Sequence, residues 1–554
     1  MRKKFLIMFA IMLIMVFDIA TSFADNPIVQ TVYTADPAPM VYNGRVYAYV
    51  GHDEDDAPTT TYKMKEWRCY SSADMVNWTD HGAVLPVTAF KWATQTKDAN
   101  AAQVIYRNGK FYYYVSVYDT THPGIAVGVA VSNSPTGPFT DAIGHALVTN
   151  DMTKYASHGW DDLDPTVFID DDGQAYLYWG NNACYYAKLN NDMISINGSI
   201  NAIPLNTTAF GPDYEEAPWV YKRDGTYYMI YASGFPECIR YSTSSSPTGP
   251  WTYKGVVMTT QGGSNTNHPG IIDFNSNSYF FYHTDGLSGS TSYKRSVCIE
   301  QFKYNTNGTI PQLNMTKTGV TQISNLNPYV KTEAETICME SGVETEQCSE
   351  GGVDVCNIEN GDYIKVKGVN FASGAASFDA RVASATSGGN IELRLDSPTG
   401  TLVGTCAVTG TGGWQTWVNK SCNVSGATGI HDLYLKFTGG SGNLFNFNWW
   451  KFNTSLSSPT STPTSTPTLK PTSTPTSKPS STSTSTPTPT STPANSIDLN
   501  HDGAINMADV ILLASKFNTV KGNTGYIDSY DLNKDGVINM ADVIIIAAKF
   551  NTIV

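Results

Sequence analysis

DPTVFIDDDGQAYLYWG, from Asp164 to Gly180, is the stretch that decides the fold. It has the pattern of two short strands joined by an acidic glycine turn, the first apolar after Asp-Pro and the second aromatic. We expect the DDDG turn, Asp170 to Gly173, to be a solvated hairpin. Four variants occur elsewhere: DPAPMVYNGRVYAYV from Asp36, NAAQVIYRNGKFYYYV from Asn100, EAPWVYKRDGTYYMIY from Glu216 and HPGIIDFNSNSYFFYH from His268.

Each copy carries a tyrosine in its second strand that serves as an anchor for alignment. These anchors are Tyr47, Tyr112, Tyr176, Tyr227 and Tyr279, and successive ones are 65, 64, 51 and 52 residues apart. Later segments such as YSSADMVNW, VSNSPTGPF and YSTSSSPTGPW add outer strands with their own turns. A repeat of this length with about four short strands is typical of a β-propeller. Residues 25–330 are therefore predicted to form a closed five-bladed β-propeller in a mainly β protein.

Composition limits the kind of partner. The 554 residues predict several domains, 15% are charged, 12% are aromatic and the net charge is −14. Phosphate binding needs a basic surface, so we expect no nucleic acid partner. We expect no membrane partner either, and the aromatic content favours a neutral ligand stacked on rings.

The N-terminus has the pattern of a secretory signal peptide over residues 1–24. A basic start precedes an apolar run from Phe5 to Phe17, and the small residues Ser22 and Ala24 follow. A membrane anchor is the alternative, although the run is short for a span. We expect cleavage after Ala24 and a secreted, extracellular chain. Its nine cysteines have no metal-ligand spacing, and their connectivity stays open.

Three further segments follow the repeats. Residues 331–453 alternate apolar and polar positions between glycine-rich turns, which predicts a jelly-roll-like β-sandwich. Residues 454–496 are almost wholly Ser, Thr and Pro and are predicted to be an extended linker. Residues 497–554 contain the near-duplicates DLNHDGAINMADVILLASKFNT and DLNKDGVINMADVIIIAAKFNT.

Each near-duplicate has oxygen-bearing residues at the spacing of a calcium loop, followed by an amphipathic helix. Gly503 and Gly536 occupy the sharp turn at the sixth position. Hard oxygen ligands at these intervals suit Ca²⁺, so we expect one ion in each loop. The predicted metal ligands are Asp498, Asn500, Asp502, Asn506 and Asp509 in the first loop and Asp531, Asn533, Asp535, Asn539 and Asp542 in the second.

Acidic residues head three of the propeller repeats. Asp36, Asp164, Glu216 and His268 lie 11 or 12 positions before their anchoring tyrosines, and Asn100 heads the remaining copy. Strand starts in a propeller meet at the central channel, so these side chains are expected to face one pocket. Paired carboxyl groups there suit glycoside hydrolysis, in which one protonates the leaving oxygen and the other activates water. Capping of strand starts, or a structural cation, is the alternative for the same residues.

The motifs TADPAPM, DLDPTVFIDDDG, EEAPW and NHPGIID resemble glycoside hydrolase family 43, whose members are five-bladed propellers that invert configuration. The resemblance implies that Asp36 is the general base and Glu216 the general acid. It gives Asp164 the role of setting the pKa of Glu216. Glu215 is the competing neighbour, and Glu216 is preferred because it directly precedes Ala-Pro.

The resemblance also suggests residues that bind substrate. His268 matches a histidine near a central ion, which implies a calcium ion in the channel. Arg295 in YKRSVCIEQF matches a pocket arginine, with a surface salt bridge as an equal alternative. Trp92, Trp160 and Phe235 are candidates for stacking on the sugar, with ordinary packing as the alternative.

Runs such as MKEWRCYSSADMVNWTDHG resemble the arabinoxylan arabinofuranohydrolases of this family. That implies removal of α-L-arabinofuranosyl branches from xylan, with β-xylosidase or arabinanase activity as alternatives. The WMNDPNG-like motif of fructan hydrolases is absent. A non-catalytic carbohydrate-binding propeller is the rival class, but a lectin would not need the three acids.

The appended segments resemble two known modules. The sandwich is similar to carbohydrate-binding module family 6, in which Trp414 and Asn446 match sugar-contacting positions. Asn357 replaces the usual second aromatic residue, and a calcium ion is also expected in this module. The near-duplicate resembles a dockerin, which implies a cohesin domain of a cellulosome scaffold as partner, contacted by Met507-Ala508 and Met540-Ala541.

Overall fold

The structure is a computed structural model. It describes residues 26–153, 158–454, 497–499, 504–505, 507–517, 519–522, 526–547, 549 and 552–553. The predicted signal peptide and nearly all of the predicted linker lie outside the described residues. None of the described helices is long and apolar enough to cross a membrane.

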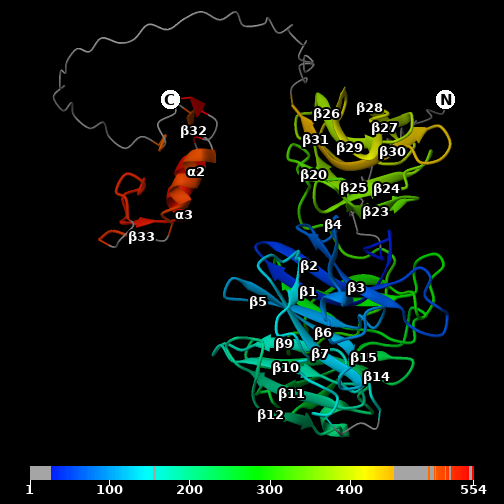
Figure 1. Cartoon of the computed structure of the whole chain (residues 1–554), viewed down its shortest axis with the longest axis vertical. Coiled ribbons are helices and arrows are strands. Elements are labelled where there is room, and N and C mark those ends of the chain that lie inside the picture. Colours follow the sequence, from blue (N-terminus) through cyan, green and yellow to red (C-terminus); the bar gives the residue numbers. More distant parts are fainter. Residues whose placement is uncertain are drawn as a thin grey trace, which may run out of the picture. The chain divides into compact units, whose positions relative to one another are not determined.

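Five antiparallel sheets follow one another along residues 33–302 of the described chain (Figure 1). Each of the first four has four strands in sequence order, and the fifth has three. The strands are β1 (Tyr33–Tyr42), β2 (Arg45–Asp53), β3 (Met64–Ser72) and β4 (Trp78–Pro86) in sheet I; β5 (Ala102–Arg107), β6 (Lys110–Asp119), β7 (Gly124–Ser132) and β8 (Thr140–Asp141) in sheet II; β9 (Thr166–Ile169), β10 (Ala175–Trp179), β11 (Cys184–Leu189) and β12 (Ile196–Ile203) in sheet III; β13 (Glu216–Arg223), β14 (Thr226–Ser233), β15 (Cys238–Ser244) and β16 (Thr252–Met258) in sheet IV; and β17 (Gly270–Phe274), β18 (Asn277–Thr284) and β19 (Ser296–Phe302) in sheet V.

The predicted hairpins are confirmed. In every repeat the first two strands pair antiparallel, and the anchoring tyrosine lies in the second strand, as Tyr176 opposite Phe168 illustrates. Only short helical segments accompany these sheets in the described chain, η1 (Val87–Ala89) and α1 (Thr207–Phe210).

Successive side chains in a strand point to opposite faces of the sheet, and both faces are buried here. In β2, Tyr47 and Tyr49 pack in a cluster with residues of sheet II such as Tyr113. The intervening Val46 and Ala48 pack in a cluster with residues of sheet V. Three other clusters join sheets II and III, III and IV, and IV and V. Because side chains in a strand alternate between faces, each sheet packs against both of its neighbours.

The N-terminal segment pairs with the free edge of sheet V. The Ile28 N–H donates to the Val297 carbonyl (2.9 Å), and the Thr34 N–H donates to the Arg295 carbonyl (2.9 Å). The Asn26 side chain exchanges two hydrogen bonds with the Ile299 backbone, each 3.0 Å. The first described residues therefore hold the last sheet against the first.

The DDDG turn is not merely solvated, contrary to the expectation. Asp170 accepts hydrogen bonds from the Tyr227 hydroxyl (2.7 Å) and the Lys222 ammonium (2.9 Å). Asp171, whose side chain is largely exposed, accepts from Lys222 as well. Hydrogen bonds and ion pairs therefore join the acidic turn of sheet III to the first hairpin of sheet IV.

Residues 332–453 form two facing sheets, as expected for a sandwich. One contains β23 (Glu344–Gln347), β24 (Val353–Cys356), β31 (Asn446–Asn453), β26 (Ser377–Ser384) and β29 (Gly413–Asn423), with β20 (Thr332–Glu333) beside β31. The other contains β22 (Met339–Ser341), β25 (Tyr363–Asn370), β30 (Ile430–Gly439), β27 (Gly388–Leu395) and β28 (Thr401–Thr409).

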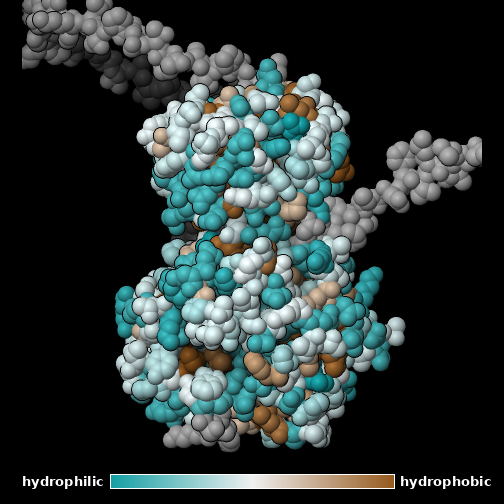
Figure 2. All heavy atoms as spheres, turned by 90° about the vertical axis from the view of Figure 1, so that its right-hand side faces the viewer, coloured by the Kyte–Doolittle hydropathy of each residue, from teal (hydrophilic) through white to brown (hydrophobic). Residues whose placement is uncertain are grey.

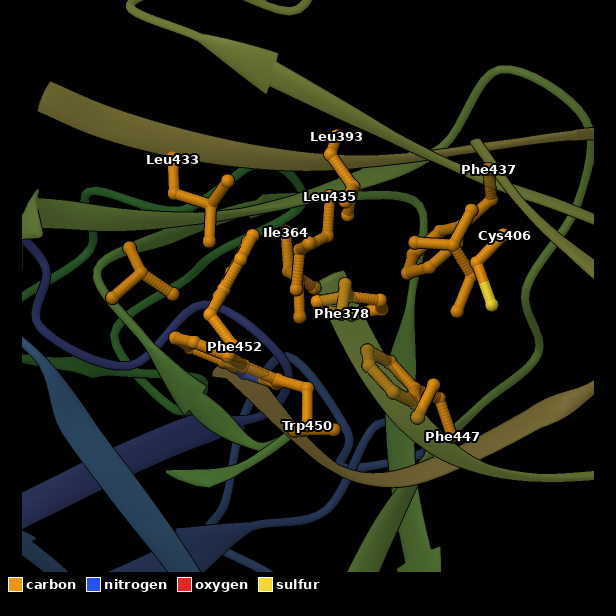
Figure 3. Packing of buried hydrophobic residues seen from close by; sticks show 14 of the residues in the cluster. Ile364, Phe378, Leu393, Cys406, Leu433, Leu435, Phe437, Phe447, Trp450 and Phe452 are labelled. Carbon is orange, nitrogen blue, oxygen red and sulfur yellow. The ribbon is translucent and has the colours of Figure 1, made fainter. Parts of the chain in front are cut away.

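Aromatic and aliphatic side chains fill the space between these two sheets (Figure 3). Phe378, Trp450 and Phe452 come from one sheet and meet Leu435 and Phe437 from the other, and all five are fully buried. Removing one such large side chain typically costs about 3–5 kcal/mol of stability. The sandwich therefore has a hydrophobic core of its own.

Specific contacts join the sandwich to sheet I. The strand β21 (Thr336–Ile337) pairs with β4. The Asn77 amide exchanges hydrogen bonds with the Lys367 backbone, donating to its carbonyl (3.0 Å) and accepting from its N–H (2.8 Å). Asp74 orients Asn77 by accepting from its amide (2.7 Å). Figure 2 shows one face of these two lobes, largely hydrophilic or neutral with small separate hydrophobic patches.

The C-terminal residues form a separate unit. It contains α2 (Met507–Ala514) and α3 (Met540–Ala547), the helices that begin within the near-duplicates. Short pairs accompany them, β32 (Ala504–Ile505) with β35 (Thr552–Ile553) and β33 (Thr519–Val520) with β34 (Val537–Ile538). Leu513, Ile538 and Ile546 are buried in its small core.

Candidate active site

A cavity of about 400 Å³ opens where the propeller strands begin. Residues that head all five repeats line it: Asp36, Asn100, Asp164, Glu216 and His268. They come from five different sheets or the segments that enter them, so the repeat pattern correctly brings them to one place. Burial of so many polar side chains is costly unless each has partners.

The backbone bends at three of these strand starts. Asp36, Asp164 and Ala217 have left-handed φ values of 51°, 62° and 57°, and each directly precedes a proline. The register of β1 shifts after Ala35 and that of β13 after Glu216. Such bulges redirect a side chain at the end of a strand. By this backbone criterion Ala217 is the equivalent of the two aspartates, and Glu216 lies one residue earlier.

Asp36 is held by a cation and a neutral histidine. Its Oδ1 accepts from Nη1 of Arg295 (2.8 Å), and its backbone N–H donates to Nδ1 of His283 (3.3 Å). His283 therefore carries its proton on Nε2, which donates to the Thr266 carbonyl (2.8 Å). Burial raises the pKa of Asp36, and the Arg295 guanidinium counteracts this rise. Burial also holds the pKa of His283 well below its usual range, so this ring is neutral.

Arg295 is a pocket residue and not part of a surface salt bridge. It is 3% exposed, and two of its nitrogens bind the carboxylate of Asp53 at 3.0 Å each. Asp53 also accepts from the Arg295 backbone N–H (2.8 Å) and is completely buried. The guanidinium lies 4.5 Å from the centre of the Tyr62 ring. This two-point contact leaves Nη1 aimed at Asp36.

Asp164 connects three sheets. Its backbone N–H donates to the hydroxyl of Ser116 in β6 (2.9 Å). Its Oδ2 accepts from the Ala217 N–H at the start of sheet IV (3.0 Å). Burial is the largest cause that raises the pKa of Asp164 well above its usual range, and repulsion by Glu216 and Asp36 adds to it. Asp164 therefore fixes the backbone next to Glu216.

Glu216 is partly exposed to the cavity, and two side chains hold it. Its Oε2 accepts from the Asn181 amide (2.6 Å), and its carboxyl is hydrogen-bonded to that of Glu237. Burial raises the pKa of Glu216, with Asp36 and Glu215 adding repulsion, while Asn181 and Glu237 lower it. Burial is thus the main cause of the rise, ahead of any neighbouring charge. The neighbouring Glu215 accepts from the Asn182 amide instead (2.8 Å).

Two of the three candidate stacking residues lie at the cavity. Trp160 and Phe235 line it and are 55% and 68% exposed, and the Trp160 ring stacks on His158 at 4.3 Å. Trp92 does not: it is buried in the core between sheets I and II, and its Nε1 donates to Asp141 (3.0 Å). The sequence cannot separate these roles, because the period-2 pattern predicts only that an aromatic residue is near a strand.

His268 is buried at the cavity wall. Burial lowers its pKa to about 3, and Arg295 contributes, so the ring is neutral at ordinary pH. Among the described residues, no group of three or more His, Cys, Asp or Glu side chains could hold a metal ion. The calcium expected near His268 and in the sandwich stays a prediction.

Several pocket or support residues were not predicted from the sequence, among them Asp53, Asn181, Glu237 and His283. None heads a repeat. Asp53 is the last residue of β2 and His283 the last but one of β18, whereas Asn181 and Glu237 lie in turns after β10 and β14. A search for polar residues at the far end of each second strand would have found Asp53 and His283.

The sandwich residues matched by resemblance lie at one end of β26. Gly413 pairs with Ser384 and Asn446 with Ala383, so the two candidate positions flank this strand. Asn446 is 3% exposed, and its amide donates to Glu346 (2.6 Å). Trp414 is partly exposed, and Asn357 is exposed and donates to Glu344 (3.3 Å).

The second predicted calcium loop is described in full, but Asn500, Asp502, Gly503 and Asn506 of the first lie outside the described residues. Gly536 has a φ of 88°, as the sharp turn requires. Asp531 and Asp542 accept backbone N–H groups of the loop, including Gly536 N–H (2.8 Å) and Leu532 N–H (2.7 Å). In the first loop, Asp509 likewise accepts from Leu499 N–H (2.7 Å), and Asp498 is buried. All donors are oxygens, so the donor chemistry fits Ca²⁺.

Three family models match the chain. Glycosyl hydrolases family 43 matches residues 24–310, Carbohydrate binding module (family 6) matches residues 333–454, and Dockerin type I domain matches residues 488–551.

Two relatives are similar to this chain over about three quarters of its length. An arabinoxylan arabinofuranohydrolase of Bacillus subtilis is 39% identical over 77% of this chain and 92% of its own. One from Paenibacillus polymyxa is 36% identical over 78% of this chain and 75% of its own. The crystal structure of a glycoside hydrolase family 43 arabinoxylan arabinofuranohydrolase from Bacillus subtilis in complex with cellotetraose has a TM-score of 0.68 at 36% identity, covering 78% of this chain and 99% of that one.

Replacing Asp53 tests the buried ion pair. Asp53→Asn leaves the Arg295 guanidinium buried with half of its charge compensation, so we expect a loss of about 3–5 kcal/mol in the free energy of unfolding. Denaturant unfolding followed by fluorescence measures it. Asp171→Asn is the matched control, because an exposed ion pair is worth at most about 1 kcal/mol. Equal stability of the two variants would contradict the role given to Asp53.

Proposed function

Because the chain belongs to the glycosyl hydrolases of family 43, we propose that its cavity removes α-L-arabinofuranosyl side chains from arabinoxylan with inversion. The observation that carries the proposal is the meeting of Asp36, Asp164 and Glu216 at one cavity. The similarity to two arabinoxylan arabinofuranohydrolases supports the substrate. β-Xylosidase or arabinanase activity is the alternative, which product analysis on arabinoxylan, arabinan and xylo-oligosaccharides would distinguish.

In this mechanism Asp36 is the general base. Arg295 favours its ionised form, and burial keeps its pKa above the ordinary value, so it can accept a proton from water near neutral pH. As water attacks the anomeric carbon, the glycosidic C–O bond breaks. The new C–O bond forms on the opposite face of the sugar, which inverts the configuration.

Glu216 is the general acid. Its raised pKa keeps it protonated, and it gives that proton to the departing glycosidic oxygen. Asp164 holds the Ala217 N–H and so fixes Glu216, in addition to the electrostatic role that the family resemblance implies. Trp160 and Phe235 at the mouth of the cavity offer faces for the substrate.

The whole chain is proposed to be a secreted component of a cellulosome. Its parts are a signal peptide (1–24), a five-bladed catalytic propeller (25–330), a sugar-binding sandwich (331–453), a linker (454–496) and a dockerin (497–554). The five sheets that pack in succession support the blade count. The module matches support a sugar ligand for the sandwich and a cohesin partner for the dockerin.

Removal of the acid tests the assignment. We expect Glu216→Ala to lower kcat/KM on arabinoxylan by about 10²- to 10⁴-fold, the usual contribution of a positioned acid. Glu215→Gln is the comparison variant and should lose far less activity, because Glu215 binds Asn182 and contributes only a minor repulsion to Glu216. Release of sugar by Glu216→Ala at the native rate would contradict the assignment of Glu216 as the general acid.

The stereochemistry gives an independent test. Proton NMR of fresh product should show the β-anomer of arabinofuranose first, with the α-anomer growing in by mutarotation. The α-anomer as first product would exclude direct attack by water activated by Asp36.

Calcium binding tests the C-terminal module. Asp531 supplies the first position of the second loop, so Asp531→Ala should lower the number of calcium ions bound by the full chain by one. Isothermal titration of calcium-stripped protein measures this number. Asp528→Ala, an exposed residue paired with Lys521, is the control and should leave the number unchanged. Equal numbers in both variants would remove the second loop from the calcium sites.

A further inference from the structure

A buried carboxyl group that heads no repeat also lines the cavity. Glu237 is the last residue of the turn between β14 and β15, is 3% exposed and lines the cavity with Glu216. The mechanism above gives it no part. A buried acid in this place needs a reason, because burying an ionised carboxylate without a partner is expensive.

We propose that Glu237 is a positioning residue for Glu216: it keeps its own proton and donates a hydrogen bond to the carboxylate that Glu216 becomes. This inference rests on the proposed function of Glu216 as general acid. It adds a residue that acts through the acid and does not touch the reacting atoms.

The geometry requires a proton between the two side chains. The carboxyl groups of Glu216 and Glu237 are hydrogen-bonded to each other, and two ionised carboxylates cannot form such a bond. Glu237 is fixed from behind: its Oε2 accepts from the Asn267 N–H, and its own N–H donates to the Asn265 carbonyl (3.0 Å). These two backbone contacts hold Glu237 in place beside Glu216.

The surrounding charges favour the protonated form of Glu237. The charged groups that face the pair are Asp164, Asp36 and Glu215, all acidic. The nearby cation, Arg295, is bound to Asp53 and Asp36. Burial raises the pKa of Glu237 well above its usual range, and repulsion by Glu216 adds to it.

The hydrogen bond matters most when the substrate bond breaks. Glu216 then loses its proton to the glycosidic oxygen and becomes an anion among other acids. The Asn181 amide and the Glu237 hydroxyl both donate to it, so the charge forms opposite two donors already in place. Glu237 ends the step with the proton it began with. The benefit is therefore confined to substrates whose leaving group must be protonated.

The test compares leaving groups in two variants. Glu237→Ala removes the donor, whereas Glu237→Gln keeps one through its amide. On arabinoxylan we expect kcat/KM of Glu237→Ala to fall by about 10- to 100-fold, and that of Glu237→Gln by about threefold at most. On 2,4-dinitrophenyl α-L-arabinofuranoside, whose leaving group needs no proton, both variants should stay within about threefold of the native enzyme.

The pH profile gives a second readout. The acid works below its pKa, so it sets the basic limb of kcat/KM. Loss of the donor destabilises the Glu216 carboxylate and raises its pKa, which should move this limb to higher pH in Glu237→Ala. The limb should stay in place in Glu237→Gln. Thermal unfolding of both variants checks that the fold is retained.

Glu216→Ala, measured on the same two substrates, separates this inference from the proposed function. If that variant shows no dependence on the leaving group, the acid assignment itself fails. If it does, but Glu237→Ala loses activity equally on both substrates with an unmoved basic limb, Glu237 is only structural and the inference is overturned.

Discussion

The buried guanidinium of Arg295 is the interaction on which the cavity depends. It binds Asp53 through two nitrogens and Asp36 through a third, and so neutralises part of a strongly acidic site. Burial of a charge is tolerated only with partners of this quality. With one cation committed to two aspartates, Asp164, Glu216 and Glu237 must share protons. The charge balance of the site therefore favours the protonated form of these acids, and burial raises the pKa of each.

The site is built from contacts between sheets. Arg295 and His283 of sheet V hold Asp36 at the start of sheet I. Ser116 of sheet II holds Asp164, which in turn holds Ala217 of sheet IV. The packing of aromatic clusters between sheets keeps these distances, because close-packed interiors deform little. A mutation far from the cavity that shifts one sheet would therefore also change the distances between the carboxyl groups.

The periodic part of the structure could be predicted from the sequence, and the irregular part could not. Hairpin pairing and the meeting of the strand starts follow from alternation and repeat length, which depend on many residues at once. The partners of Asp53 and Glu237 lie 242 and 30 positions away in the chain, so the local sequence does not reveal them. Trp92, for which sugar stacking and ordinary packing were both considered, is a core residue, and the local sequence does not distinguish a core tryptophan from a sugar-binding one. In the fourth repeat the left-handed residue before proline is Ala217, so the acid Glu216 lies one residue earlier than Asp36 and Asp164 do in their repeats.

The pairing of Asn26 with Ile299 joins positions 273 apart in the chain. During synthesis Asn26 leaves the ribosome long before Ile299 has been added to the chain. Until Ile299 has been synthesised, the N-terminal segment has no strand of sheet V to pair with, and sheets I to IV can only form an open arc. Contacts between such distant positions form slowly. The cavity, whose walls come from both ends of this arc, is consequently among the last parts of the domain to be completed, and a chain that has not yet reached Arg295 lacks part of its wall.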